Sequence, residues 1–482
     1  MSNMILVLDL GDGRGSAVAR RVRSEQVYSE VLSADASIEM IRAASPMGVL
    51  IAGDGNLGLA SLPELLDLGI PVLAMGASAR LILKALGGAH VPTARSECTA
   101  QVTFEPSPLF QGLGESERYF ECMDALELPE GARAIATAED GQIAAFSVDE
   151  RIFGLQFYAE QNDPDGFQIL RNFARGVCKC EPLWNFPRFF EETLAKIQAQ
   201  AQGGKVLLAV SGGVDSVVCA ILMGKALGEQ LVCVHVDTGL MRKGELDLTK
   251  RCLEPQGIRL KMIDASERFI ERLDGVQGSA RKTALVDQEI LKVLEEEARV
   301  LGARGLGLGV TYSDVLDGST LLDRTLSPDS PFKALIQPVR RLFKEEVRQV
   351  AEQLNLPPEL AQRPPFPTAG LAVRMLGPAT PGKLTMLREA DAIFCEEIQK
   401  AGLDKRIRQY FAVLTGSMTR AASGRTGCTL ALRAMNGANA FRLPYDLLER
   451  VVERVTGEVD GIIRVVYDVT GHPPAMVEWE DE

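Results

Sequence analysis

The chain has 482 residues, of which 46% are apolar and 24% charged, and 52 Lys and Arg against 65 Asp and Glu leave a net charge of −13. Its length indicates about three domains, because a single core rarely grows beyond roughly 250–300 residues. The negative charge argues against nucleic-acid and membrane partners, although a local pocket of Arg and Lys can still hold a small phosphate ligand.

The start of the chain has no basic region and reaches an acid at Asp9, unlike a signal peptide or a membrane span. We therefore expect a cytoplasmic protein. Nine cysteines, an odd number spread along the chain, and only three histidines favour reduced thiols over disulfides or a Cys/His zinc site.

The first block alternates strand-like and helix-like segments, which is typical of an α/β domain. Apolar runs at 4–8, 48–52 and 71–75 predict strands, and 78–86 predicts a helix. The block ends near Cys178, and residues 180–187, with two prolines and a tryptophan, predict a linker before an amphipathic helix at 188–202.

The second block opens with a βαβ unit on a parallel sheet: a strand at 205–210, a helix to about 227 and a strand at 231–237. A proline-rich stretch at 363–367 closes this block. A helix near 384–401, strands at 429–435 and 462–469, and a helix at 446–455 then predict a small α+β domain. The three predicted domains are 1–180, 188–376 and 377–482.

The sharpest local signal is the loop Ser-Gly-Gly-Val-Asp-Ser at 211–216, between a buried strand and a helix. Its glycines allow a ligand to approach the backbone closely. The serine hydroxyls and the amides at the start of the helix offer hydrogen-bond donors to that ligand, which suits pyrophosphate. The loop lacks the lysine of a Walker A motif. The alternative is an ordinary glycine turn with a serine cap.

Ser-Gly-Gly-Val-Asp-Ser resembles the signature of N-type ATP pyrophosphatases, and further motifs resemble the GMP synthetase family over essentially the whole chain. They lie in order at 234–245, 264–269, 312–315, 337–344, 365–374, 464–468 and 473–480. The resemblance implies an α/β protein of three domains: a class I amidotransferase-like α/β domain, an adenine-nucleotide α-hydrolase-like parallel α/β domain (the ATP pyrophosphatase), and a small α+β dimerisation domain.

By that resemblance, ATP adenylylates the carbonyl oxygen of a purine nucleotide, xanthosine monophosphate (XMP), with release of pyrophosphate, and ammonia then displaces AMP. ATP and Mg²⁺ are the implied cofactors. The implied ATP-binding residues are Ser211, Gly212, Gly213, Val214, Asp215, Ser216 and Asp237. Asp215 and Ser216 are the catalytic candidates, with Asp215 the metal ligand. Alternatively, Asp215 complements the helix dipole, and Asp237 and Asp314 are either metal or ribose ligands or turn-forming acids.

The first block resembles a class I glutamine amidotransferase, but its catalytic positions differ. The family's nucleophilic cysteine corresponds to Gly76, and its Phe-His-Pro-Glu corresponds to Phe157-Tyr158-Ala159-Glu160. Gly76, Tyr158 and Glu160 therefore form a degenerate triad, and glutamine hydrolysis, which needs a thiolate, is predicted to be lost. Ser78 with His90 is a disfavoured replacement pair. Cys98 and Cys122 are expected to be core thiols on strands.

The substrate side also departs from the family. Both lid histidines are absent from 325–334, His472 replaces a lysine, and Met476 replaces a threonine. The candidate substrate-binding residues are Arg340, Arg374, Arg433, Arg442, His472 and Glu478. An imidazole binds phosphate less well than an ammonium does.

The leading hypothesis is a homodimeric AMP-forming ligase of the GMP synthetase type that uses free ammonia or ammonia from a separate glutaminase. One alternative is a diverged paralogue that adenylylates a different substrate. Another is a nucleotide sensor that binds ATP without turnover.

Overall fold

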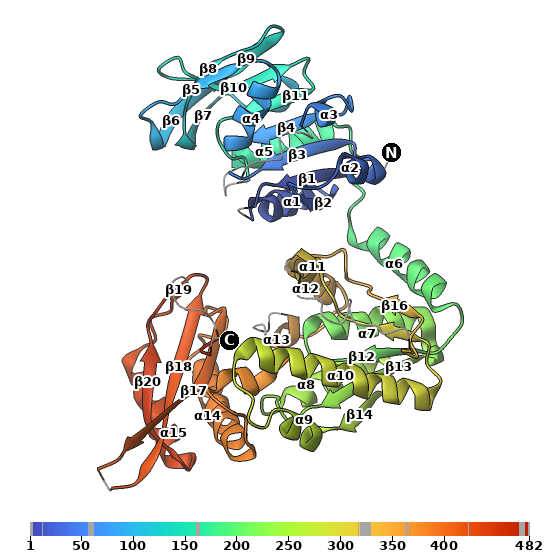
Figure 1. Ribbon diagram of the computed structural model, residues 1–482, viewed down its shortest axis with the longest axis vertical. Coiled ribbons are helices and arrows are strands. Elements are labelled where there is room, and N and C mark those ends of the chain that lie inside the picture. The colour runs from blue at the N-terminus through green and yellow to red at the C-terminus, as the bar shows by residue number, and fades with distance from the viewer. Residues whose placement is uncertain are drawn as a thin grey trace. The chain divides into compact units, whose positions relative to one another are not determined.

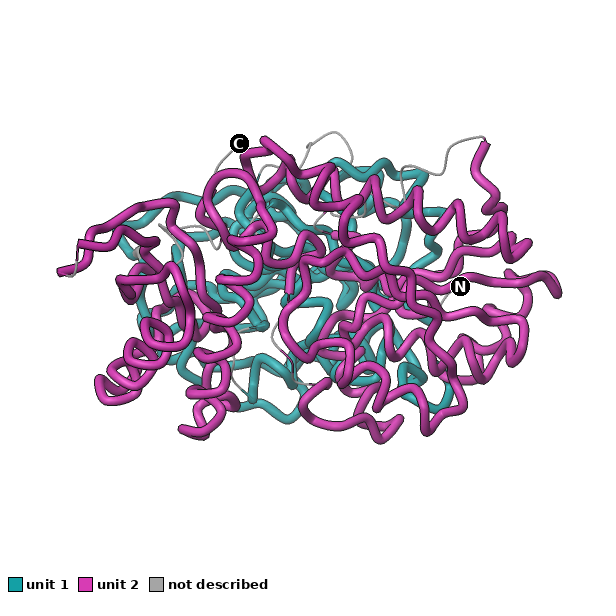
Figure 2. The backbone as a smooth tube through the Cα atoms, turned by 90° about the horizontal axis from the view of Figure 1, so that it is seen from below, with its two compact units in different colours: residues 1–189 teal, residues 190–482 magenta. Residues whose placement is uncertain are grey.

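The computed structural model describes residues 3–11, 13–55, 62–160, 164–316, 318, 329–361, 363, 366–422, 424–471 and 478–480. It forms two compact units, residues 1–189 and 190–482, coloured separately in Figure 2. The predicted boundary between 376 and 377 lies inside the second unit and stays a prediction. Among the described residues, no helix combines the length and apolar character that crossing a membrane requires.

The first unit is built on a nine-stranded sheet in the order β2-β1-β3-β4-β11-β10-β9-β6-β7 (Figure 1). The first five strands are mutually parallel, and the other four pair antiparallel. The strand bounds are β1 Met4–Asp9, β2 Tyr28–Ser33, β3 Gly48–Ala52, β4 Val72–Met75, β6 Ser96–Phe104, β7 Glu115–Cys122, β9 Ala132–Ala138, β10 Ile143–Val148 and β11 Ile152–Leu155.

A two-stranded sheet and five α-helices complete the described part of this unit. They are β5 Ala89–Val91, β8 Ala125–Glu127, α1 Arg14–Ser24, α2 Ile38–Ala44, α3 Leu62–Leu66, α4 Ala77–Ala85 and α5 Pro164–Arg171, the last continued by a π-helical turn at Asn172–Val177. Every residue of β3 and β4 is buried, which explains their continuous apolar sequences. The strands predicted at 4–8, 48–52 and 71–75 and the helix at 78–86 are confirmed.

The second unit contains an all-parallel sheet in the order β14-β13-β12-β15-β16. Its strands are β12 Val206–Ala209, β13 Leu231–Asp237, β14 Leu260–Asp264, β15 Gly305–Gly307 and β16 Ala334–Ile336. Its helices are α6 Phe186–Ala201, where the two units meet along the chain, α7 Val214–Leu227, α8 Glu245–Leu253, α9 Ser266–Arg272, α10 Ser279–Leu301, α11 Tyr312–Leu316, α12 Lys344–Gln353 and α13 Pro358–Ala361. Leu291 and Leu294 of α10 pack on Leu207, Val234 and Leu306 of the sheet.

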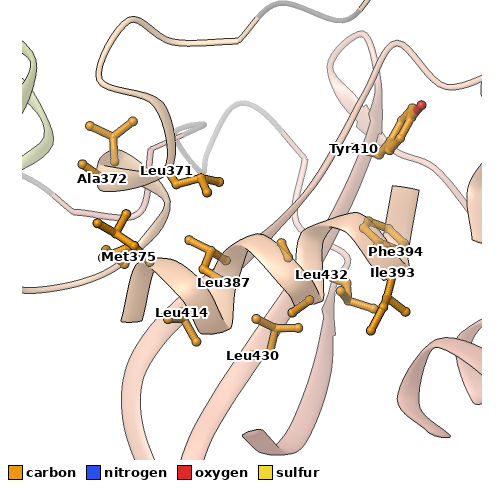
Figure 3. Close-up of a cluster of buried hydrophobic side chains, with 14 of the residues drawn as sticks. Leu371, Ala372, Met375, Leu387, Ile393, Phe394, Tyr410, Leu414, Leu430 and Leu432 are labelled. Carbon is orange, nitrogen blue, oxygen red and sulfur yellow. The ribbon is translucent and has the colours of Figure 1, made fainter. Parts of the chain in front are cut away.

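The rest of the second unit is a four-stranded sheet covered by two helices. The elements are β17 Gln409–Arg420, β18 Thr426–Asn436, β19 Asn439–Ala440, β20 Ile462–Asp468, α14 Pro381–Lys400 and α15 Tyr445–Glu458. Figure 3 shows Leu387 and Phe394 of α14 among Leu414, Leu430 and Leu432 of the strands. The cluster also includes Leu371, Ala372 and Val373 of the 3₁₀ segment Gly370–Arg374. β17 was not predicted from the sequence, whereas α14, β18, α15 and β20 were.

Candidate active site

The loop Ser211–Ser216 joins β12 to α7 at the carboxyl edge of the parallel sheet. Gly212 has a φ of 95°, a conformation that glycine adopts without strain. The Ser216 hydroxyl donates to the Gly213 carbonyl oxygen at 2.9 Å and accepts from the Gly212 amide at 3.2 Å. Ser216 is only 3% exposed. Its observed role is therefore to brace the loop, and its predicted catalytic role stays a prediction.

Asp215 lies in the first turn of α7, and its buried Oδ1 atom has no hydrogen-bond partner in the described structure. Burial raises the pKa of this carboxyl to about 6, against the lowering effect of the Lys344 ammonium, and the neighbouring Asp314 carboxylate contributes to the rise. Mg²⁺ is commonly held by one or two carboxylates together with substrate phosphates and water. Asp215 thus fits a Mg²⁺ ion that accompanies ATP. Asp314 accepts hydrogen bonds from Thr311 and pairs with Lys344 at 3.2 Å, so its observed contacts are those of a turn-forming acid.

Arg363 contacts the loop at the Gly212 backbone. It was not predicted as a site residue from the sequence. Its Nη1 atom donates to the Gly212 carbonyl oxygen at 3.2 Å, and its guanidinium forms an ion pair with Glu245 at the start of α8. Burial lowers the pKa of Arg363 to about 10, with Arg242 adding to the effect. The only sequence signal was its place at the start of the proline-rich stretch, and this place by itself does not indicate phosphate binding.

A cavity of about 1130 Å³ opens beside Arg363. Seven basic and five acidic side chains line it: Arg242, Lys243, Arg251, Arg348, Arg363, Lys405 and Arg408, with Glu245, Glu345, Glu359, Asp391 and Asp404. The cavity is locally positive although the chain as a whole is negative. Arg242 and Arg363 already pair with Asp391 and Glu245, so the local basic pocket for a small phosphate ligand stays a prediction.

Asp237 ends β13 directly beside Asp264 of β14. Its Oδ1 atom accepts a hydrogen bond from the Gly239 amide at 2.9 Å, which is the geometry of a turn-forming acid. The observed contact thus agrees with the alternative considered for Asp237, and ATP binding by this residue stays a prediction.

Three of the predicted substrate-binding residues lie close together: Arg433 on β18, Arg374 on the 3₁₀ segment Gly370–Arg374, and Glu478 after β20. Arg374 is 3% exposed and stacks over the Phe411 ring at 3.7 Å, while Arg433 is 1% exposed and pairs with Asp468 at 3.5 Å. Burial lowers the pKa of Arg374 to about 10, with Glu478 opposing this effect and Arg433 adding to it. Since both arginines already have protein partners, substrate contact by either one remains a prediction.

The other candidates are more dispersed. Arg340 follows β16 and donates from Nη1 to Gln337 Oε1 at 2.8 Å, and Arg442 is exposed after β19. His472, Met476 and residues 325–328 of the segment 325–334 lie outside the described residues.

Lys282 of α10 holds the last described residues of the chain in place. Its fully buried ammonium donates to the carbonyl oxygens of Met375 at 3.1 Å and Gly377 at 2.7 Å and to Glu480 Oε2 at 2.5 Å. The other oxygen of Glu480 accepts from the Gly377 amide at 2.8 Å. Lys282 thereby links the segment after Arg374 to the segment that carries Glu478.

In the first unit, Gly76 forms the sharp turn between β4 and α4, with φ 65° and ψ −130°. Such a strained strand-to-helix turn is the backbone of a nucleophile elbow. Gly76 supplies the turn without any side chain to attack a substrate.

Tyr158 lies beside Gly76, and Arg14 contacts both Tyr158 and Glu160, so the structure brings the three positions of the degenerate triad together. The Tyr158 hydroxyl donates to Asp54, and the Arg14 guanidinium lies 3.9 Å from the centre of the Tyr158 ring. Arg14 also pairs with Glu160 at 3.4 Å. The carboxylate that a glutaminase would use to orient a histidine is here paired with an arginine.

The disfavoured replacement pair does not form. Ser78 is fully buried and donates to the carbonyl oxygens of Ile51 and Met75, while His90 Nδ1 lies 2.8 Å from Asp124 Oδ2. Cys98 and Cys122 do lie on strands β6 and β7, but each is only half-buried, so the expectation of core thiols was wrong. For Cys122 the reason is that β7 is an edge strand of the nine-stranded sheet.

Two family models match parts of this chain. Residues 6–177 match "Glutamine amidotransferase class-I", and residues 396–479 match "GMP synthase C terminal domain". Proteins named GMP synthase [glutamine-hydrolyzing] align with almost the entire chain. Those of Lactiplantibacillus plantarum and Clostridium novyi are 37% and 39% identical over 508 and 506 residues, covering 99% of this chain and 98% and 99% of their own lengths.

The chain belongs to the GMP synthase family. The predicted family, the α/β fold class and the ATP-dependent ligase class of enzyme are thereby confirmed. The relatives are named for glutamine hydrolysis, whereas a glycine occupies the elbow of this GMP synthase family member.

Proposed function

We propose that this protein is a GMP synthase that takes ammonia itself, having lost the hydrolysis of glutamine. The carbonyl oxygen of XMP attacks the α-phosphate of ATP and pyrophosphate leaves; ammonia then adds to the activated carbon, and AMP departs to give GMP. The observation that carries the ligase half is the loop Ser211–Ser216, with the unpaired buried oxygen of Asp215 and with Arg363 bonded to the loop backbone.

In the first step, the protein positions the phosphates of ATP and stabilises their negative charge. The α7 amides and the nearby Arg348 side chain favour the phosphates, and Asp215 would hold Mg²⁺. When bound, Mg²⁺ neutralises charge on the departing pyrophosphate. Arg374, Arg433 and Glu478 are the proposed contacts for the purine nucleotide.

Loss of glutamine hydrolysis is supported by Gly76, which offers no nucleophile at the elbow, and by the ion pair between Arg14 and Glu160. Ammonia then comes from solution or from a separate glutaminase.

A homodimer is also proposed. Exposed apolar side chains gather on α15 and near β20, where Tyr445 is 75%, Val466 40% and Val469 73% exposed. Such exposed apolar groups suit an interface between copies of the chain. Sedimentation analysis of the purified protein tests this, and a monomer at micromolar concentration contradicts it.

The deciding experiment measures pyrophosphate release and GMP formation by the purified protein with Mg-ATP and XMP, with ammonium or glutamine as nitrogen donor. We expect GMP with ammonium and none with glutamine. GMP formation with glutamine contradicts the lost glutaminase. No pyrophosphate with either donor contradicts the choice of XMP, and the two alternatives, a different acceptor or a nucleotide sensor, then follow.

A further inference from the structure

Tyr158 fills the space that any side chain at position 76 needs. A Cβ atom built on Gly76 would overlap Cζ and Oη of Tyr158 and would lie 2.6 Å from Cε1 of the same ring. Real Cβ atoms essentially never approach another heavy atom within 3.0 Å. A cysteine at the elbow and a tyrosine at position 158 therefore exclude each other unless one of them moves.

Tyr158 is held against such a movement. Its hydroxyl donates a hydrogen bond to Asp54, its ring stacks against the Arg14 guanidinium, and the residue is only 3% exposed. Arg14 is itself fixed by ion pairs with Glu121 and Glu160. The neighbours Phe157 and Ala159 are fully buried, so the backbone on both sides is also anchored in the core. Displacing the ring would break a hydrogen bond and a cation–π contact together.

We propose that Tyr158 is a specificity-determining residue for the nitrogen donor: its ring closes the former glutaminase centre, so that neither a nucleophilic side chain at position 76 nor the amide of glutamine fits there. This inference rests on the proposed function and goes beyond the missing nucleophile. It makes positions 76 and 158 coupled, so that restoring a cysteine alone does not reopen the site.

The test introduces Gly76→Cys into the full-length protein in three backgrounds: unchanged Tyr158, Tyr158→Phe and Tyr158→Ala. Phenylalanine is the matched control, because it keeps the ring atoms that collide with the new Cβ and loses only the hydroxyl. Each protein is treated with iodoacetamide, and mass spectrometry follows alkylation of the peptide that contains position 76. Thermal unfolding of each protein is measured in parallel.

We expect the new thiol at position 76 to be alkylated at least about tenfold faster in the Tyr158→Ala background than in the other two, because thiol reactivity depends on exposure. The loss of thermal stability caused by G76C should also be smallest in the Tyr158→Ala background. Equal alkylation rates in the three backgrounds, including no alkylation in any of them, overturn the inference. So does a stability loss from G76C that is the same in all three. Gly76→Ala, whose Cβ meets the same ring atoms, repeats the stability comparison with a smaller side chain in case G76C does not fold.

This test is independent of the test of the proposed function. If the wild-type protein makes GMP from glutamine, the proposed loss of glutaminase is wrong, whatever the variants show. If the wild type uses only ammonium and the three backgrounds behave alike, the glutaminase is lost through Gly76 alone, and the role given to Tyr158 is wrong.

Discussion

The elbow at Gly76 and the loop at Ser211–Ser216 occupy equivalent places in two different sheets. Each follows a buried parallel strand and begins a helix, and each has a glycine at positive φ. The loop keeps a buried carboxylate with an unpaired oxygen, whereas the elbow keeps only its backbone and is filled by Tyr158. A strand–turn–helix framework therefore does not depend on the side chain at its turn, because the buried strands stabilise it.

The largest effect is expected from Asp215→Asn, which keeps the shape of the side chain and removes its charge. This substitution tests whether the loop Ser211–Ser216 is the ATP site. We expect pyrophosphate release to fall by about 100-fold or more, in the range seen when a preorganised electrostatic group is lost. The measurement is pyrophosphate release with Mg-ATP, XMP and ammonium. Asp54→Asn, which loosens Tyr158 in the first unit, is the control and should stay within about twofold of the wild type. An Asp215→Asn enzyme as active as that control would show that the loop is not the ATP site.

Arg363→Met tests whether the contact of Arg363 with the loop Ser211–Ser216 contributes to ATP binding. The substitution removes the hydrogen bond to the Gly212 carbonyl oxygen and leaves the buried Glu245 without its ion pair. We expect the KM for ATP to rise about tenfold, which corresponds to one lost charge-assisted hydrogen bond. Arg408→Met, in the wall of the same cavity, is the matched control and should change this KM by less than about threefold. Equal effects of the two substitutions would mean that Arg363 acts only through the charge of the cavity.

Lys282→Met tests the second half of the active site. Without the ammonium, Glu480 and the carbonyl oxygens of Met375 and Gly377 lose their shared partner, and the segments carrying Arg374 and Glu478 are no longer joined. We expect the KM for XMP to rise about fivefold, roughly the loss of one hydrogen bond's positioning energy, with the KM for ATP unchanged. Glu480→Gln should give a smaller change in the same direction. A parallel rise in both KM values would assign Lys282 to general stability.

The smallest expected effect is on stability and comes from Asp287 of α10. Burial raises the pKa of this carboxyl to about 6. An acid whose folded pKa is raised lowers stability when ionised, so the penalty is absent below the unfolded pKa near 4 and complete above about pH 6. Asp287→Asn should therefore raise the free energy of unfolding of the second unit at pH 7, by at most about 3 kcal/mol. Denaturant unfolding at pH 4 and pH 7 measures this. The same gain at both pH values would contradict the role of ionisation.

Strands β1, β3 and β4 of the first parallel region, strands β12 and β13 of the second, and the position of the loop followed from the sequence, because buried strands have continuous apolar sequences and the turns between them are rich in glycine. β17 was missed, because its second half, after Leu414, is largely exposed and polar and weakens the apolar pattern. Cys122 was assigned to the core, because the sequence does not show that β7 is an edge strand.

The sequence alone determined which residues lie at the turns, and so that Gly76 offers no nucleophile and that Asp215 opens a helix. Only the tertiary structure decided that Arg363 supports the loop from 151 residues away, that Lys282 clamps Glu480 across 198 residues, and that Tyr158 fills the space beside Gly76. The physical reason is that strand and turn patterns are local, whereas burial, charge pairing and steric exclusion depend on which distant side chains the packed core brings together.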